Sequence, residues 1–120
     1  MAILKKLFSS VQSKVQSKSA AITPRQARQM MDDLDEYVLL DVRSYDEYKQ
    51  KRIDGAKLIP VDELAARAAT ELPDKRVPVF VYCRSGARAG TAVKMLNDMG
   101  YESILSIGGI NDWPFETIGG

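Results

Sequence analysis

The sequence has no histidine and a single cysteine, Cys83. One cysteine cannot form a disulfide within the chain, and a cysteine-based zinc site needs several. Without histidine, Ser-His-Asp triads, Cys-His pairs and histidine metal sites are excluded. Any catalysis must therefore use cysteine, carboxylate, tyrosine, lysine, arginine or backbone amide groups. If Cys83 is redox-active, a second molecule must complete its cycle.

The sequence also lacks a strong charge of either sign and a long apolar run. It has 17 basic and 16 acidic residues, whereas a nucleic-acid-binding protein usually has a clear basic excess. No apolar stretch approaches the roughly 18 residues of a membrane-spanning helix. We therefore predict no nucleic-acid partner and no transmembrane segment. A cytoplasmic location is expected, and a periplasmic or membrane-peripheral one stays open.

Metal ions and nucleotide cofactors have no recognisable site in the sequence. The carboxylates between residues 32 and 36 form a solvated acidic run, which does not by itself indicate a metal site. The glycine pairs at 108–109 and 119–120 are too isolated to be phosphate-binding loops. We predict neither a metal nor a cofactor.

An N-terminal segment, residues 1–21, differs in composition from the rest of the chain. Its apolar residues recur at helical spacing: Leu4, Leu7, Phe8, Val11 and Val15. Lysines lie between them, acidic residues are absent, and the long apolar centre of a secretory signal is missing. We interpret the segment as an amphipathic helix, either frayed or docked. The alternative is a peripheral membrane or partner contact made by residues 1–18.

Residues 22–120 are predicted to form one domain, since a chain of this length suits a single fold with its own core. Short apolar runs predict strands at residues 37–42, 56–60, 77–82 and 103–107. Gly108-Gly109 is expected to form a turn after the last of these strands. Helical patterns cover residues 24–34, 45–51, 61–72 and 89–99. Thr23 is a good helix cap, and Ser44 with Glu47 predicts a capping box. The alternation predicts an α/β fold with a mostly parallel central sheet and helices on both faces.

Cys83 directly follows the strongest predicted strand, and parallel α/β sheets bind ligands beyond the carboxyl ends of their strands. The following loop, Arg84-Ser85-Gly86-Ala87-Arg88, leads into a helix, so several unpaired N–H groups form an anion-binding cradle. This cradle should favour the thiolate form of a sulfur at its centre. Gly86 is the loop residue best able to take unusual backbone angles. The alternative is that Cys83 is a small buried residue ending a strand.

Four sequence motifs resemble, in the same order, the signatures of the rhodanese family of sulfurtransferases. They are Leu39-Leu40-Asp41-Val42-Arg43 with the following Tyr45-Asp46-Glu47-Tyr48, then Arg52-Ile53-Asp54-Gly55-Ala56, Val81 through Ala89, and Gly108-Gly109-Ile110-Asn111-Asp112-Trp113. The resemblance covers about residues 22–113. The chain departs from many members by having Arg52 in place of a histidine, and from some by lacking a second cysteine.

The resemblance implies that Cys83 carries sulfur as a persulfide. A donor such as thiosulfate would supply the sulfur, the amides of residues 84–88 would hold it, and a thiol, sulfite or cyanide would remove it. Arg84 and Arg88 can attract an anionic donor, although both could instead be solvated surface residues. Asp41 and Arg43 are expected to pair and support the active-site loop.

Two other functions remain as alternatives. Phosphatases that share this fold use a longer loop between the cysteine and the arginine than the one joining Cys83 to Arg88. The stronger alternative is a non-catalytic binding module, or a sulfur carrier that docks to a protein donor or acceptor. Because the chain keeps both Cys83 and its loop, we favour an enzyme.

Overall fold

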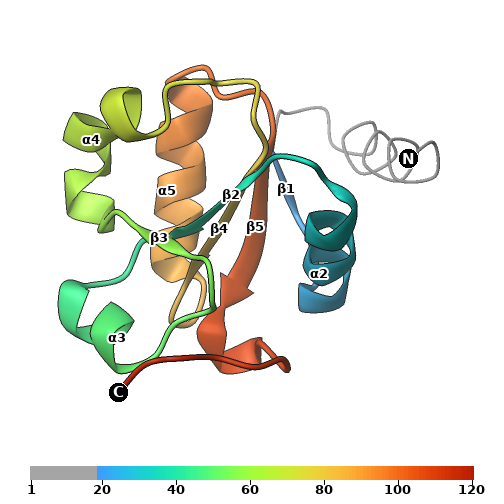
Figure 1. Cartoon of the computed structure of the whole chain (residues 1–120). Helices are drawn as coiled ribbons and strands as arrows, with labels where there is room; N and C mark the ends of the chain where they lie inside the picture. Colours follow the sequence, from blue (N-terminus) through green and yellow to red (C-terminus); the bar gives the residue numbers. More distant parts are fainter. Residues whose placement is uncertain (1–18) are drawn as a thin grey trace.

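The computed structural model describes residues 19–120, which fold around one five-stranded parallel sheet (Figure 1). The strands are β1 (Ser19–Ala21), β2 (Val38–Asp41), β3 (Lys57–Leu58), β4 (Val79–Cys83) and β5 (Ile104–Gly109). Their order across the sheet is β1-β5-β4-β2-β3, and each neighbouring pair is parallel. The helices are α2 (Pro24–Asp33), α3 (Tyr45–Gln50), α4 (Leu64–Glu71) and α5 (Ala87–Asp98), with 3-10 turns η1 (Val61–Glu63) and η2 (Ile110–Asp112).

Helices cover both faces of the sheet. Helix α2 lies on one face together with the C-terminal segment, and α4 and α5 lie on the other (Figure 1). Each face has its own apolar core, to which α2 contributes Met30 and α5 contributes Leu96. The predicted α/β fold is confirmed.

Strand β4 runs through the middle of the sheet, and all five of its residues are buried. Successive side chains point to opposite faces of a strand. Phe80 and Tyr82 accordingly pack on the α2 side, whereas Val81 and Cys83 pack on the α4–α5 side. The cysteine is therefore positioned by the most buried strand of the fold.

Capping boxes begin two of the helices. The Thr23 hydroxyl accepts a hydrogen bond from the Gln26 N–H at 3.1 Å, and the Ser44 hydroxyl accepts one from the Glu47 N–H at 3.2 Å. In return, each side chain three residues on accepts from the N–H of the cap residue. The helix starts predicted at Thr23 and Ser44 are confirmed.

The N-terminal boundary of the sheet differs from the prediction. Residues 19–21 form β1, which pairs with β5, so the domain boundary placed at Ile22 leaves out an edge strand. A stretch of one serine and two alanines has little intrinsic strand preference, so its pairing with β5 decides its structure. The predicted amphipathic helix and its membrane or partner contact fall on residues 1–18, outside the described residues.

Two further elements of the structure differ in detail from the sequence prediction. The predicted helix at 61–72 begins as the 3-10 turn η1 and becomes α-helical only at Leu64. Gly108 and Gly109, expected to form a turn, instead belong to β5 and pair with the last two residues of β4 after an irregular register. No helix formed by residues 19–120 is both long and apolar enough to cross a membrane.

Candidate active site

Cys83 is the last residue of β4, at the carboxyl edge of the sheet. The residue is only 1% exposed, and its Sγ atom accepts a hydrogen bond from the Gly86 N–H at 2.9 Å. The chain thus curls around the sulfur within three residues. A backbone amide aimed at sulfur stabilises a negative charge there more than a neutral thiol.

Gly86 makes this curl possible. Its φ of 113° is left-handed, a region that costs a residue with a Cβ atom far more than glycine. Gly86 is also the N-cap of α5, and its carbonyl accepts the first helical hydrogen bond, from the Gly90 N–H. The N–H groups of residues 87–89 therefore have no acceptor within the helix. Together with the helix dipole, they suit an anion next to Cys83.

The end of β5, with its glycine pair 108–109, packs against the backbone of the Cys83 loop. A Cβ atom on Gly109 would lie 2.1 Å from the Arg84 carbonyl oxygen, a distance that no side chain could tolerate. The Asn111 N–H donates to that same carbonyl at 3.3 Å. The sequence motif at 108–113 therefore acts at the site through backbone contact, which the prediction of a simple turn did not foresee.

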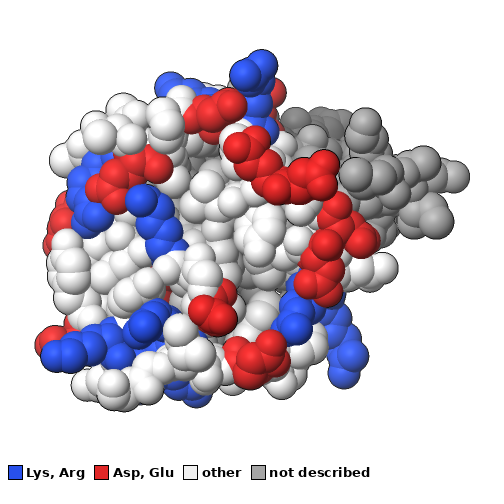
Figure 2. Space-filling model, in the orientation of Figure 1, with Lys and Arg blue, Asp and Glu red and all other residues white. Residues whose placement is uncertain are grey.

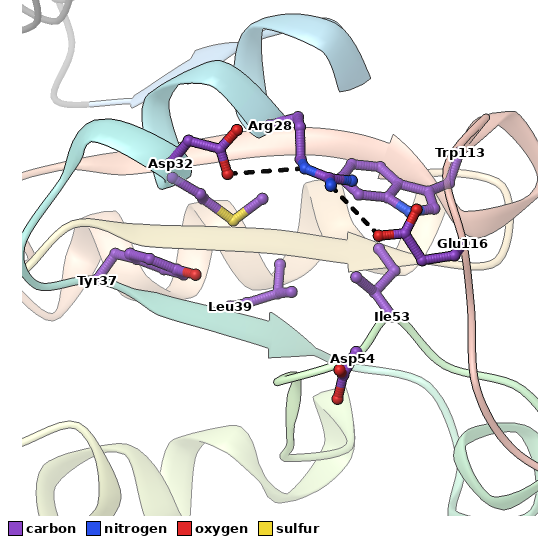
Figure 3. Close-up of a pocket in the computed structure, with 9 residues that line it drawn as sticks. Arg28, Asp32, Tyr37, Leu39, Ile53, Asp54, Trp113 and Glu116 are labelled. Atoms are coloured by element: carbon purple, nitrogen blue, oxygen red, sulfur yellow. Dashed lines mark hydrogen bonds and ion pairs between the residues drawn. The ribbon is translucent and has the colours of Figure 1, made fainter.

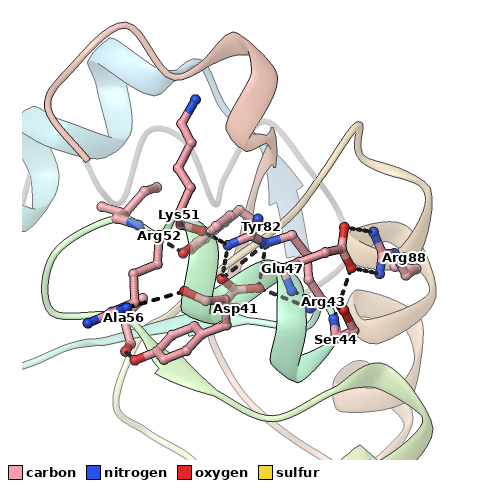
Figure 4. Close-up of polar contacts among 11 residues, drawn as sticks. Asp41, Arg43, Ser44, Glu47, Lys51, Arg52, Ala56, Tyr82 and Arg88 are labelled. Atoms are coloured by element: carbon pink, nitrogen blue, oxygen red, sulfur yellow. Dashed lines mark hydrogen bonds and ion pairs between the residues drawn. The ribbon is translucent and has the colours of Figure 1, made fainter. Parts of the chain in front are cut away.

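The two arginines of the loop have different surroundings. Arg84 is exposed and forms no ion pair with any residue in 19–120. Arg88 is half-buried and donates to both carboxylate oxygens of Glu47, at 2.7 and 2.9 Å (Figure 4). The hydrogen bonds from Arg88, together with those from Ser44, lower the pKa of Glu47 to about 2. Arg84 is thus the solvated cation of the loop and Arg88 the fixed one.

Asp41 and Arg43 form the expected pair, and it is buried. Arg43 Nη2 lies 2.7 Å from Asp41 Oδ2, and the side chains are only 4% and 0% exposed for Arg43 and Asp41. Arg43 Nη2 also donates to the Lys51 carbonyl at 2.5 Å (Figure 4). The pair therefore joins the end of β2 to the end of α3, and it does not bond the Cys83 loop directly.

Tyr82, the residue before Cys83, connects the Asp41–Arg43 pair to the strand that carries the cysteine. The Arg43 guanidinium carbon lies 5.6 Å from the centre of the Tyr82 ring. The Tyr82 hydroxyl accepts from the Ile53 N–H at 3.1 Å. Burial, with the nearby Asp41 carboxylate, raises the pKa of Tyr82, so the hydroxyl stays protonated at neutral pH. Tyr82 is therefore a fixed neutral group that holds β4 in place.

A polar cavity of about 260 Å³ lies beside the loop. Its lining includes three cations, Arg43, Lys51 and Arg84, and one carboxylate, Glu47. Cys83 itself does not line it, because the loop covers the sulfur. Residues 19–120 contain no group of three or more His, Cys, Asp or Glu side chains that could hold a metal ion.

The structure places the predicted site residues close together. It also shows two further residues that contact the site, Glu47 and Gly109. Cys83 and residues 84–88 form one curl, whereas Ser85 and Ala87 are exposed and contribute only backbone. Sequence reasoning missed Glu47 as the partner of Arg88 and Gly109 as the support of the loop. The sequence placed Glu47 in a capping box and in one of the four family motifs, and neither signal indicated that it pairs with Arg88.

Comparisons with known proteins give a consistent result. A family model described as Rhodanese-like domain matches residues 23–115. Thiosulfate sulfurtransferase PspE of Escherichia coli (strain K12) is 38% identical over 81 residues, which make up 68% of this chain and 78% of that protein. A protein named Sulfurtransferase from Allochromatium vinosum is 36% identical over 86 residues, 71% of this chain and 78% of its own. A solved structure titled "rhodanese with anions from E. coli" superposes with a TM-score of 0.66 at 37% identity, over 70% of this chain and 99% of that one.

Proposed function

The chain belongs to the rhodanese-like domain family, and on that premise we propose that it is a sulfurtransferase carrying sulfur on Cys83 as a persulfide. The observation that carries this proposal is the position of the Cys83 sulfur, enclosed by a loop whose Gly86 N–H donates to it at 2.9 Å. The uncapped start of α5 follows directly. A thiolate, and then a persulfide anion, is stabilised by such donors.

The reaction consists of two sulfur transfers. The Cys83 thiolate attacks the outer sulfur of a donor such as thiosulfate. A bond forms between the two sulfurs, the sulfur–sulfur bond of the donor breaks, and sulfite leaves with the electron pair. An acceptor thiolate, sulfite or cyanide then bonds to the outer sulfur, and the electron pair of the broken bond returns to Cys83 as the thiolate.

The two arginines of the loop, Arg84 and Arg88, have different roles in binding the sulfur donor. Arg84 is exposed and unpaired among the described residues, so it attracts the anionic donor and lies at the cavity with Lys51. Arg88 is bound to Glu47 and positions the first turn of α5. Because Cys83 is only 1% exposed, the donor must approach the sulfur past the exposed loop residues Arg84 and Ser85.

The test is intact mass spectrometry of the full chain after incubation with thiosulfate and removal of excess donor. The expected result is a gain of one sulfur, about 32 Da, that cyanide removes as thiocyanate. Because Cys83 is the only cysteine, Cys83→Ser is a complete control and should gain no mass. If thiosulfate, glutathione persulfide and polysulfide all leave the mass unchanged, the proposal is wrong and a binding module is the better account.

A sulfur carrier that serves one protein partner is the second candidate. The burial of Cys83 favours it, because a covered persulfide is protected from small thiols. The discriminating measurement is the rate at which preloaded protein loses its sulfur to cyanide. A rate similar in the folded and the denatured protein supports an enzyme for small acceptors. A folded protein that keeps its sulfur for many-fold longer supports the carrier.

A further inference from the structure

A second cavity lies on the α2 side of the sheet, opposite the side on which Cys83 packs. It measures about 180 Å³, the size of one long side chain, and opens between α2, β2 and the C-terminal segment (Figure 3). Met31, Leu39 and Ile53 form its apolar wall. The persulfide chemistry proposed for Cys83 makes no use of this cavity.

The cavity contains an unsatisfied hydrogen-bond donor. Trp113 is only 8% exposed, and its Nε1 is the one buried side-chain polar atom in residues 19–120 without a hydrogen-bond partner. Figure 3 shows this nitrogen on the edge of the indole ring that faces Glu116 and Ile53, two residues of the lining. Folded proteins rarely leave a buried donor unpaired, because its lost hydration is not replaced. No residue in 19–120 provides a hydrogen-bond acceptor for the indole N–H, so this donor is free to bind an acceptor from elsewhere.

The rim of the cavity is acidic. Asp32, Asp54 and Glu116 line it, and Arg28 is the only cation among the lining residues. Arg28 lies 3.7 Å from Asp32 and 3.3 Å from Glu116, whereas Asp54 forms no ion pair with a described residue. Figure 2 shows acidic side chains along the side of the molecule on which α2 lies. The cavity is thus suited to a cation that has an apolar neighbour.

The chain carries a segment with this chemistry. Residues 1–18 have four lysines, no acidic residue and apolar residues at helical spacing. Since the whole chain has 17 basic and 16 acidic residues, residues 19–120 hold 13 basic and 16 acidic ones, and the two parts have opposite charge. Eighteen extended residues span up to about 60 Å, so a segment attached at Ser19 can reach anywhere on a domain whose longest dimension is 38 Å.

We propose that residues 1–18 dock in this cavity of their own domain. Apolar side chains of the segment pack against Met31 and Leu39, and lysines lie beside Asp54 and Asp32. A backbone carbonyl or serine hydroxyl of the segment accepts from the Trp113 indole. Arg28 and Glu116 form an exposed ion pair on the rim of the cavity, and such a pair opens at small cost because surface ion pairs contribute little to stability. The Arg28 guanidinium also lies 4.9 Å from the centre of the Phe115 ring, a contact that does not require Glu116.

Trp113 is the only tryptophan, so the full chain has one indole N–H signal in a proton–nitrogen NMR spectrum, and that signal reports on this cavity. At low salt, we expect the signal of the wild type to differ from that of a variant with Lys5, Lys6, Lys14 and Lys18 all changed to Glu. Raising the salt should move the wild-type signal toward that of the variant, because screening weakens the attraction. A control with Asp98→Asn and Glu102→Gln, outside the cavity, should keep the wild-type signal.

Carbodiimide cross-linking shows where residues 1–18 lie on the domain surface. In monomeric full-length protein, the segment's lysines should link to Asp32, Asp54 or Glu116 in preference to Asp98 or Glu102. Identical indole signals in the wild type and the lysine variant at low salt would overturn the proposal, even if the segment bound anionic vesicles. Links spread evenly over the surface carboxylates would overturn it too.

Discussion

The guanidinium of Arg88 and the carboxylate of Glu47 form two parallel hydrogen bonds, of 2.7 and 2.9 Å, between the first turn of α5 and α3. The same carboxylate accepts the Ser44 N–H and so completes the cap of α3. Helix α3 follows β2, and α5 follows β4, which is the neighbour of β2 in the sheet. One carboxylate thus holds together two helices that leave the carboxyl edge of the sheet, and one of them, α5, directly follows the curl around Cys83.

Glu47→Gln should destabilise the protein at neutral pH and make its stability less sensitive to acid. The folded state lowers the pKa of Glu47 from 4.5 to about 2, so the carboxylate contributes its full stabilisation above pH 4.5 and loses it as the pH falls toward 2. Urea unfolding at pH 7 should show a loss of about 1–2 kcal/mol, reduced from the value for a buried pair by partial exposure. The difference between the two proteins should shrink steadily below pH 4.5. A difference that stays constant down to pH 2 would contradict the pairing.

Arg84→Ser should weaken the use of thiosulfate without blocking persulfide formation. The side chain is exposed and is expected to attract the donor through solvent, an effect of about 0.2–1 kcal/mol. The second-order rate constant for loading Cys83 should fall about 1.4- to 5-fold at low salt, and the loss should vanish at high salt. Arg76→Ser, which removes another exposed arginine away from the loop, is the matched control and should load like the wild type. A loss that salt does not change would indicate that Arg84 contacts the reacting sulfur.

Asp41→Asn should be much more damaging than the loss of a surface carboxylate. It leaves the charge of Arg43 buried without its partner, which typically costs about 3–5 kcal/mol. Asp74→Asn is the comparison, because Asp74 pairs with Arg76 at the surface, where a pair contributes about 0–1 kcal/mol. Both changes can be measured by guanidinium unfolding at pH 7. Equal destabilisation by the two substitutions would mean that the buried pair does not support the fold.

Features encoded by neighbouring residues could be predicted from the sequence. The caps at Thr23 and Ser44, the central strand ending at Cys83, and the curled loop with Gly86 depend on residues within a few positions of one another. The α/β architecture then followed from the alternation of elements.

The features that the sequence did not reveal depend on contacts between distant residues. Glu47 lies 41 positions before Arg88, and either residue could have been a solvated surface charge. Strand β1 has no strand-forming residues and exists through its pairing with β5. The packing of Gly109 against the Arg84 carbonyl depends on where β5 passes beneath the loop, which composition does not specify.

Gly109→Ala should abolish sulfur loading, whereas Gly90→Ala should not. A methyl group at Gly109 would meet the backbone of Arg84 and Ser85 at 2.1 to 2.6 Å, so either β5 or the Cys83 loop must shift. The amide donors around Cys83 would then lose their positions, and oriented donors of this kind typically contribute a factor of about 100 or more to a rate.

Gly90, in contrast, lies inside α5 with nothing within 4 Å of an added Cβ atom. Alanine there should stabilise the helix by about 0.5–1 kcal/mol and leave sulfur loading unchanged. Intact mass after thiosulfate treatment gives the loading, and thermal unfolding of both variants shows whether each is folded. A folded Gly109→Ala variant that loads sulfur at the wild-type rate would show that the backbone of β5 does not hold the loop. A Gly90→Ala variant that fails to load would mean that the start of α5 tolerates no change, and the contrast would then say nothing specific about Gly109.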